Sequence, residues 1–325
     1  MHRPVARVAR MLGALALAAW VGVPFEAGAQ LRFAGNTSTI ELAPVLLAAQ
    51  ELGAQRVTVK NGGIPALFDA DAADLATNAE TQALRQSVDH PDLRIIFTVA
   101  EGFYRVVARR SAGVRSLADL RGKRIATAPS TSSAFYLYKT LATVGLEPAD
   151  VTIVPLSPLS KMPAALDARE IDALTIWEPE IQRAADLVGA DAIEFQDRRV
   201  YRELFNLHAT AASLADPKKR AAIVAFMRTL IETSARIKAE PRAVWPLVAA
   251  TTGYDAALIE KVWHHEGYPA TLAADLLDVM VEEDAYLAPE RNRAPRSRAE
   301  LAKLVDDSVL REARGPAVGS PDPSR

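Results

Sequence analysis

Short apolar runs alternate with amphipathic stretches through the first two thirds of the chain. Continuous or alternating apolar positions suit a strand, whereas apolar positions spaced by three and four residues suit a helix. The alternation of the two patterns is typical of an α/β fold with mainly parallel sheets. We predict strands near residues 31–35, 56–60, 73–77, 93–99, 104–109, 124–128, 151–156, 171–176 and 205–211, and helices near 39–50, 64–70, 79–88, 132–144, 160–168 and 178–187.

From residue 216 onward the pattern changes to helices alone. Asp216 and Pro217 supply an N-cap and a first-turn proline. The apolar residues that follow recur at three- and four-residue spacings as far as Lys238, which predicts one long helix with a buried face. Residues 311–325 contain three Pro, two Gly and two Ser, and this composition predicts a loose tail.

The order of these patterns predicts two lobes. We assign residues 30–104 and 206–310, which include the C-terminal helices, to the first lobe, and residues 105–205 to the second. The polar-flanked strands at 104–109 and 205–211 are the candidates for carrying the chain between the lobes.

The first 29 residues have the features of a secretory signal. Three arginines precede an apolar segment from Leu12 to Val23, and Ala27-Gly28-Ala29 forms a small-residue cleavage site. The apolar segment is shorter than the ~20 residues that a membrane span needs, so an uncleaved anchor is the less favoured alternative. We therefore predict cleavage between Ala29 and Gln30 and export of the mature chain to the periplasm.

Composition narrows the possible functions. The chain of 325 residues is 50% hydrophobic and 24% charged, as is usual for a globular protein with a real core. Without the first 29 residues it carries 35 basic and 39 acidic residues, a net charge of −4, which gives no electrostatic footprint for nucleic acid. The absence of cysteine excludes disulfides, thiolate ligands for metals and cysteine nucleophiles.

The sequence also lacks the common enzyme motifs. We find no G-x-S-x-G, G-x-x-x-x-G-K-[ST], G-x-G-x-x-G or H-E-x-x-H pattern. The adjacent His264 and His265 point to different faces of a helix and make a poor pair of metal ligands. We therefore expect a binding protein that has no catalytic residue, no metal and no cofactor.

The segment from Ser116 to Glu180 predicts a ligand site. Its apolar runs end in hydroxyl, aromatic or carboxylate residues, at the edge where open α/β sheets bind ligands. Four consecutive hydroxyl residues, Ser130 to Ser133, precede a helix, although capping needs only one. The N–H groups in the first turn of a helix lack internal partners and favour an anion. A capping role is the alternative, as it is for the S-x-x-E box from Ser38 to Glu41.

Several motifs of this chain resemble a known family. Leu117-Ala118-Asp119-Leu120-Arg121-Gly122-Lys123, the hydroxyl cluster, and Ile171-Asp172-Ala173 with Ile176-Trp177-Glu178-Pro179 are similar to the nitrate/sulfonate/taurine-type solute-binding proteins of ABC importers. The resemblance covers most of residues 31–290. It implies a type II periplasmic binding protein fold, in which two α/β lobes joined by crossing strands close around a small anionic or zwitterionic solute. It also implies docking on an inner-membrane permease, and we expect the protein to be a monomer.

The resemblance and the strand ends together indicate the residues that contact the solute. They are Asn36, Thr37, Ser38, Asn78, Glu80, Tyr104, Thr131, Ser132, Ser133, Ser157, Trp177 and Glu178. Some have structural alternatives: Trp177 is a candidate core aromatic, Tyr104 a hinge-packing residue, and Glu80 and Glu178 are candidate solvated acids. If both acids faced the cleft, they would favour a ligand with an ammonium or amide group.

The chain departs from the family pattern in the first lobe. The segment from Leu52 to Gln55 is compressed, and Thr77-Asn78-Ala79-Glu80 replaces the usual Gly-Gly-Asp, so the identity of the solute does not carry over. The alternatives are an exported ligand-sensing protein for a signalling receptor, a binding protein for pyrimidine precursors, and an enzyme with the same fold. The lack of cysteine and the predicted export argue against the enzyme.

Overall fold

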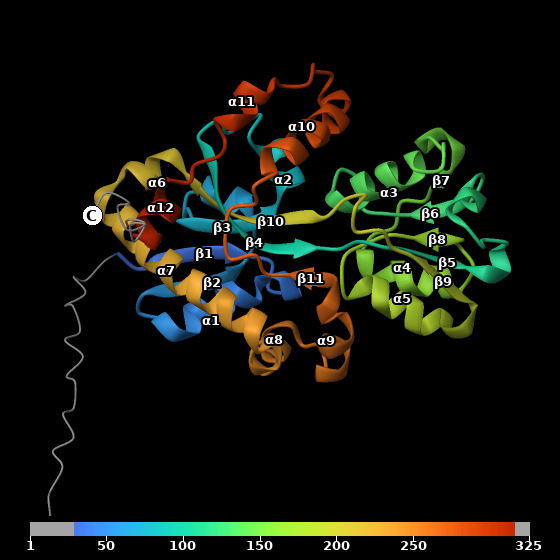
Figure 1. Ribbon diagram of the computed structural model, residues 1–325, viewed down its shortest axis with the longest axis horizontal. Helices are drawn as coiled ribbons and strands as arrows, with labels where there is room; N and C mark the ends of the chain where they lie inside the picture. The colour runs from blue at the N-terminus through green and yellow to red at the C-terminus, as the bar shows by residue number, and fades with distance from the viewer. Residues whose placement is uncertain (1–28, 316–325) are drawn as a thin grey trace, which may run out of the picture.

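The computed structural model describes residues 29–315, which form two lobes that are each built on their own β-sheet (Figure 1). The strand order is β11-β4-β10-β3-β1-β2 in the six-stranded sheet and β7-β6-β8-β5-β9 in the five-stranded sheet. We call the body around the six-stranded sheet lobe 1 and the body around the five-stranded sheet lobe 2. The strands are β1 (Leu31–Gly35), β2 (Val57–Asn61), β3 (Leu75–Ala79), β4 (Leu93–Gly102), β5 (Val106–Arg109), β6 (Arg124–Ala126), β7 (Thr152–Ile153), β8 (Ala173–Leu174), β9 (Ala192–Phe195), β10 (Glu203–Thr210) and β11 (Glu266–Gly267).

Both sheets are mixed, whereas the sequence predicted mainly parallel sheets. β1 pairs in parallel with β2 and β3, and β6 pairs in parallel with β7 and β8. β10 runs antiparallel to β3 and β4, and β5 runs antiparallel to β8 and β9. The prediction was wrong for the strands through which the chain leaves and re-enters each lobe, because local apolar patterns do not encode strand direction.

Residues 103–105 and 196–202 carry the chain between the lobes. β4 and β10 pair along their whole length, and Figure 1 shows both long strands extending from lobe 1 toward lobe 2. The predicted crossing strands at 104–109 and 205–211 were therefore misplaced. β5 lies inside the sheet of lobe 2 and β10 inside the sheet of lobe 1.

Helices cover both faces of the lobe 1 sheet. α1 and α7 cover one face, where the ring centroids of Phe33 and Phe226 lie 5.7 Å apart, and α2 and α10 cover the other. The carboxylate of Asp216 accepts hydrogen bonds from two N–H groups in the first turn of α7, so the predicted N-cap is confirmed. The helices are α1 (Ala43–Leu52), α2 (Glu80–Gln86), α3 (Ser132–Ala142), α4 (Met162–Asp167), α5 (Glu180–Val188), α6 (Ala211–Ala215), α7 (Pro217–Ala239), α8 (Trp245–Thr252), α9 (Ala256–Val262), α10 (Leu276–Leu287), α11 (Arg298–Ala302) and α12 (Ser308–Arg314).

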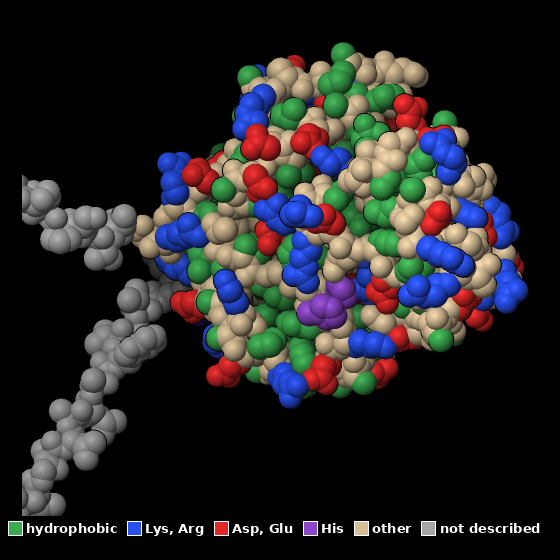
Figure 2. Space-filling view, turned by 45° about the vertical axis from the view of Figure 1, so that its right-hand side comes forward, with side chains coloured by type: hydrophobic (Ala, Val, Ile, Leu, Met, Phe, Trp, Pro, Cys, Tyr) green, Lys and Arg blue, Asp and Glu red, His purple; other side chains and the backbone are tan. Residues whose placement is uncertain are grey.

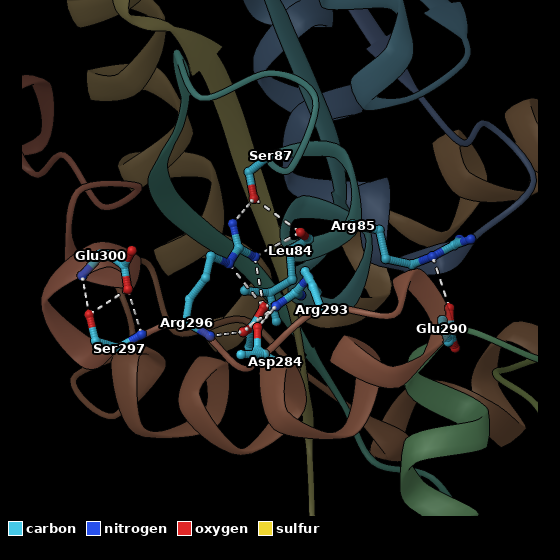
Figure 3. Close-up of polar contacts among 10 residues, drawn as sticks. Leu84, Arg85, Ser87, Asp284, Glu290, Arg293, Arg296, Ser297 and Glu300 are labelled. Atoms are coloured by element: carbon cyan, nitrogen blue, oxygen red, sulfur yellow. Dashed lines mark hydrogen bonds and ion pairs between the residues drawn. The ribbon is translucent and has the colours of Figure 1, made fainter.

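A buried ion network fixes α10 and the segment after it on α2 (Figure 3). Asp284 of α10 is fully buried and accepts hydrogen bonds from the guanidinium groups of Arg293 and Arg296. Arg296 also donates to Ser87 Oγ at 3.0 Å and to the carbonyl oxygen of Leu84 at 2.8 Å. Because a charged carboxylate is costly to bury without such partners, the network favours one position of α10, from which its other side reaches lobe 2.

The predictions for the two ends of the chain can be compared with the structure only within residues 29–315. α12 runs to Arg314, so residues 311–314 are helical and do not belong to a loose tail. The predicted signal segment, apart from Ala29, and the rest of the predicted tail lie outside the described residues. None of the helices within residues 29–315 combines the length and the apolar character that crossing a bilayer requires.

Candidate functional site

A cavity of about 440 Å³ lies between the two lobes, beside the segments that connect them. Lobe 1 lines it with the ends of β1, β2 and β3, with the 3-10 turn Ile40–Leu42 and with the start of β10. Lobe 2 lines it with the start of α3 and with Trp177, which follows β8. A molecule bound in the cavity would therefore touch both lobes.

Three asparagine side chains line the lobe 1 side of the cavity, at the carboxyl ends of three strands. β1 pairs in parallel with both β2 and β3, which brings Asn36, Asn61 and Asn78 to one edge of the sheet. The side-chain oxygen of each accepts a backbone N–H, at 3.0 Å for Asn36, 3.1 Å for Asn61 and 2.9 Å for Asn78. Since these oxygens are occupied, the amide NH₂ groups are the parts that remain to donate to a ligand.

The first turn of α3 faces the cavity from lobe 2. Thr131 and Ser132 both line the cavity, and the Thr131 hydroxyl donates to the carbonyl oxygen of Ala128 at 2.7 Å instead of capping the helix. The first N–H groups of α3 therefore have no side-chain acceptor from the N-cap residue. Together with the partial positive charge of a helix N-terminus, they suit an electronegative group of a ligand.

Hydrogen bonds join the two lobes at the edge of the cavity. The hydroxyl oxygens of Thr81 in lobe 1 and Ser132 in lobe 2 lie 3.0 Å apart, and Gln82 Nε2 donates to the carbonyl oxygen of Ser130 at 2.9 Å. Farther out, Lys139 of α3 and Glu282 of α10 form an ion pair at 2.5 Å. The lobes are therefore in contact around the cavity, as a clamp in its closed form requires.

Two carboxylates make the lining acidic. Glu41, in the 3-10 turn, and Glu203, at the start of β10, are exposed by only 4% and 5%. Burial raises the pKa of Glu203 to about 7, although hydrogen bonds from Tyr104 and Ser132 oppose this rise. Burial and the nearby charge of Glu203 raise the pKa of Glu41 well above its usual range. Among the described residues, no Lys, Arg or His side chain lines the cavity.

Aromatic rings form part of the remaining wall. Tyr104 and Phe205 line the cavity beside the connecting segments, and Trp177 lines it from lobe 2. The Tyr104 hydroxyl donates a hydrogen bond to the carboxylate of Glu203, so this ring lies next to the acidic part of the lining. Aromatic faces of this kind pack well against planar groups and against cations.

Half of the predicted contact residues line the cavity, namely Asn36, Asn78, Tyr104, Thr131, Ser132 and Trp177. Their contact with a ligand stays a prediction. The structure gives three of the other six different surroundings. Thr37 donates its N–H and its hydroxyl to Asn61, the carbonyl oxygen of Ser38 accepts from Tyr254, and Ser157 is exposed outside the cavity.

The side chains of Glu80 and Ser133 are buried inside the protein and do not line the cavity. Glu80 is fully buried and accepts hydrogen bonds from the hydroxyl of Tyr201 and from the N–H of Leu204. The Ser133 hydroxyl donates to the carbonyl oxygen of Thr175 at 2.6 Å. Both side chains therefore satisfy polar groups inside their own lobe, which corrects their placement in the cleft.

Glu178 also lies outside the cavity wall. It is exposed by only 5%, and its Oε1 lies 2.6 Å from Nη1 of Arg105. Burial raises the pKa of Glu178 to about 7, and the charge of Arg105 opposes the rise. Because Glu178 has its own buried cation, its role in the structure is an internal ion pair.

Sequence reasoning missed seven lining residues that carry polar or aromatic groups. They are Thr39, Glu41, Asn61, Thr81, Gln82, Glu203 and Phe205. Glu41 was hidden by its match to a capping box, but Thr39 is the residue before the turn and no side-chain cap forms there. The sequence feature that could have indicated Glu203 is its position as a lone carboxylate at the start of an otherwise mostly apolar strand.

Metal binding finds no support in the part of the chain that the structure describes. Within residues 29–315, no group of three or more His, Asp or Glu side chains is arranged to hold a metal ion.

Similarity to solved structures identifies the fold as that of the type II periplasmic binding proteins. The periplasmic aliphatic sulphonate binding protein SsuA from Escherichia coli superposes with a TM-score of 0.70 at 17% identity, over 84% of this chain and 91% of that one. The alkanesulfonate-binding protein SsuA from Xanthomonas axonopodis pv. citri, bound to MOPS, gives a TM-score of 0.65 at 22% identity, over 85% of this chain and 98% of that one. At these identities the likeness shows the fold.

The chain belongs to the NMT1/THI5-like family, because residues 57–258, more than half of its length, match the model of that family. The predicted relationship to solute-binding proteins and the predicted fold class are thereby confirmed. A protein of Escherichia coli (strain K12) named "Putative aliphatic sulfonates-binding protein" is 26% identical over 245 residues, which are 75% of this chain and 65% of that protein. A "Putative binding protein" of Brucella abortus (strain 2308) is 36% identical over 77 residues, so the match spans only 24% of this chain and 23% of the relative.

An enzyme shares the fold as well. The desulfurization enzyme DSZB superposes with a TM-score of 0.60 at 16% identity, over 88% of this chain and 98% of that one. The fold by itself therefore does not separate binding from catalysis, and the groups in the cavity have to decide between them.

Proposed function

We propose that this protein is the solute-binding component of an ABC importer, which holds a small polar solute in the cavity between its lobes. The observation that carries the proposal is the cavity of about 440 Å³, which is lined from both lobes and bordered by the hydrogen bond between Thr81 and Ser132. Family membership and the fold support the same conclusion. A ligand that touches both lobes would stabilise the closed form, which is the form that a permease would recognise.

The groups in the cavity favour binding over catalysis. Ser132 and Thr131 are the hydroxyl groups at the start of α3, and no His or Lys lies beside them among the described lining residues to activate a nucleophile. Glu203 accepts a hydrogen bond from Tyr104, which suits a group that holds a ligand in place.

The proposal includes a location and partners. We propose that the mature chain acts in the periplasm as a monomer, after removal of residues 1–29, and delivers its solute to an inner-membrane permease. Figure 2 shows acidic and basic side chains interspersed over the face that it draws, which agrees with the proposal that nucleic acid is not a partner.

Thermal unfolding of the mature chain with a panel of small solutes tests the proposed function. A true ligand at one hundred times its dissociation constant should raise the free energy of unfolding by about 2.7 kcal/mol. The double variant T131A/S132A removes both hydroxyls at the start of α3 and should lose most of this gain, whereas S157A, at an exposed site outside the cavity, should keep it. Ser133 is left intact because its hydroxyl holds lobe 2 together.

Two results would contradict the proposal. One is the absence of stabilisation by every solute in a broad panel, and the other is chemical conversion of a solute that does bind. Equal stabilisation of the wild type and T131A/S132A would instead mean that the solute does not use the start of α3.

A further inference from the structure

The two carboxylates in the cavity have no positive partner. Glu41 and Glu203 form no ion pair with any of the described residues. Glu266 has none either, and burial together with the charges of Glu41 and Glu203 raises its pKa well above the usual range. The hydrogen-bond donors near Glu203 are the neutral hydroxyls of Tyr104 and Ser132. The acidic part of the cavity is therefore uncompensated from within the protein.

The nearest buried cation serves other groups. Arg105 is exposed by only 1%, and its nitrogens lie 2.6 Å from the carboxylate of Glu178, 3.0 Å from that of Glu194 and 2.8 Å from the side-chain oxygen of Gln182. His265 contributes no charge at neutral pH, because burial and the charge of Arg105 lower its pKa to about 3. Among the described residues no side chain supplies a positive charge to Glu41 and Glu203. These carboxyl groups therefore either bind protons, as their raised pKa values allow, or meet a cation from outside the chain.

Burying two carboxylates without a partner is costly, since desolvation disfavours their charged form. A protein can avoid this cost by replacing such residues with amides or apolar side chains. A ligand cation removes the cost in another way, because it supplies charge-assisted hydrogen bonds to both carboxylates at once. A cationic ligand would therefore explain why two carboxylates without a partner in the protein line the cavity.

The aromatic lining fits the same kind of ligand. Tyr104 lies next to Glu203, with Phe205 two residues farther along β10, and Trp177 borders the cavity from lobe 2. Ring faces attract a nearby ammonium group through their quadrupole, most strongly for tryptophan. Carboxylates and aromatic rings around one cavity are thus complementary to an organic cation.

We infer that the solute carries a protonated nitrogen, which binds at Glu41 and Glu203, while an electronegative group at its other end meets the first turn of α3. This inference rests on the proposed function and names the chemical class of its solute. Of the two kinds of solute that the sequence predicted, anionic and zwitterionic, the inference selects the zwitterionic one. A solute with only negative charge, such as nitrate or a simple alkanesulfonate, would have to face two buried carboxylates.

Titration calorimetry of the mature chain with matched pairs of compounds tests the inference. One pair is 2-aminoethanesulfonate and ethanesulfonate, and another is 3-aminopropanoate and propanoate, so that only the nitrogen differs within a pair. Because charge-assisted hydrogen bonds contribute about 1.5–3 kcal/mol, the nitrogen-bearing member should bind at least about tenfold more tightly.

Variants of the two acids show whether Glu41 and Glu203 cause the preference. E41Q and E203Q keep the side-chain shape and remove the charge, and each should reduce the ratio of affinities within a pair by about tenfold. E312Q, on the surface of α12, changes the net charge of the protein equally and should leave the ratio unchanged. Because the readout is a ratio measured on one folded protein, a moderate change in stability does not affect it.

The outcomes separate the inference from the proposed function. If nitrogen-free compounds bind as tightly as their partners, or if E41Q and E203Q leave the ratio unchanged, the inference fails and the proposed function stands. If neither the pairs nor the broad panel of solutes bind, both fail. A preference for the nitrogen-bearing members that is lost in both variants supports the inference.

Discussion

Lobe 1 and lobe 2 differ in the charged groups that they present to the cavity that they share, because only lobe 1 adds carboxylates to its hydrogen-bond donors. Lobe 1 contributes the carboxylates of Glu41 and Glu203, whereas lobe 2 contributes the first turn of α3 with its donor N–H groups. A solute held between them would lie with its positive end on lobe 1 and its negative end on lobe 2. The difference between the lobes therefore provides both recognition of the solute and a reason for the lobes to close on it.

The lobes also differ in whether a buried carboxylate has a cation beside it. Glu178 of lobe 2 has Arg105 at 2.6 Å, whereas Glu41 and Glu203 of lobe 1 have no cation among the described residues. A buried acid with an internal partner serves the structure. A buried acid that faces a cavity without a partner is available to a ligand, and this difference can be tested directly.

The largest expected effect comes from removing the internal partner of lobe 2. In R105M the buried carboxylate of Glu178 loses its cation, and breaking such a pair costs about 3–5 kcal/mol. Urea unfolding of the mature chain measures this loss. R124M, which breaks a partly exposed pair with Asp172 in the same lobe, is the matched control and should cost at most about 1 kcal/mol.

A loss below about 1 kcal/mol in R105M would show that Glu178 does not depend on Arg105. The double variant R105M/E178Q should recover most of the lost stability, because no buried charge is then left without a partner. Failure to recover would assign the effect of R105M to lost packing of the long side chain.

A smaller effect is expected from pH, through an acid of lobe 1 that lies outside the cavity. Burial raises the pKa of Glu80 to about 8, well above its usual value of 4.5, so the folded state holds a proton that the unfolded state releases. Its contribution to stability is complete below pH 4.5 and is lost as the pH rises through 8. Through Glu80 alone, the free energy of unfolding should fall by up to about 1.4 kcal/mol per pH unit from pH 6.5 to 8.

Thermal unfolding across this pH window measures the slope. Glu203 and Glu178, with pKa values raised to about 7, act in the same direction as Glu80. Burial lowers the pKa values of His208 and His265 to about 3, so these groups act in the opposite direction near pH 6.5, where an unfolded histidine still binds protons, and their effect fades toward pH 8. E283Q should flatten the slope, because it removes a buried carboxyl group whose own pKa is raised well above its usual range by burial and by the charge of Glu80. A stability that increases from pH 6.5 to 8 would contradict the assignment.

The smallest effect is expected where the lobes meet at the surface. Lys139 of lobe 2 and Glu282 of lobe 1 are exposed by 31% and 57% in their side chains, so their pair contributes about 0.2–1 kcal/mol to closure. K139A should therefore weaken solute binding by at most about fivefold, as measured by calorimetry. The effect should vanish at 1 M salt, where the Debye length is about 3 Å.

K161A, at an exposed lysine of lobe 2 outside the lobe interface, is the control for this variant. It should leave the affinity unchanged at low and high salt. A loss in K139A that persists at high salt would mean that the lysine supports the fold of α3 and not the closure of the lobes.

Local sequence patterns predicted the elements and part of the site. α7 begins after Asp216 as its capping and apolar spacing indicated, and most strands lie within a few residues of their predicted positions. Asn36 and Asn78 were predicted through the resemblance to the solute-binding family, and both line the cavity. These predictions succeeded because they depend on neighbours in the chain. β9 and β11 were missed because they are short and lack a marked apolar pattern.

The two carboxylates of the cavity could not be predicted from the sequence, because their surroundings consist of contacts that only the folded protein creates. A glutamate looks the same in the sequence whether it pairs with a cation, as Glu178 does with Arg105, or faces a cavity, as Glu41 and Glu203 do. Its environment is set by residues far away in the chain. The sequence alone therefore determined a two-lobed α/β protein with a polar edge, whereas the tertiary structure decided which carboxylates line the cavity without a cation beside them.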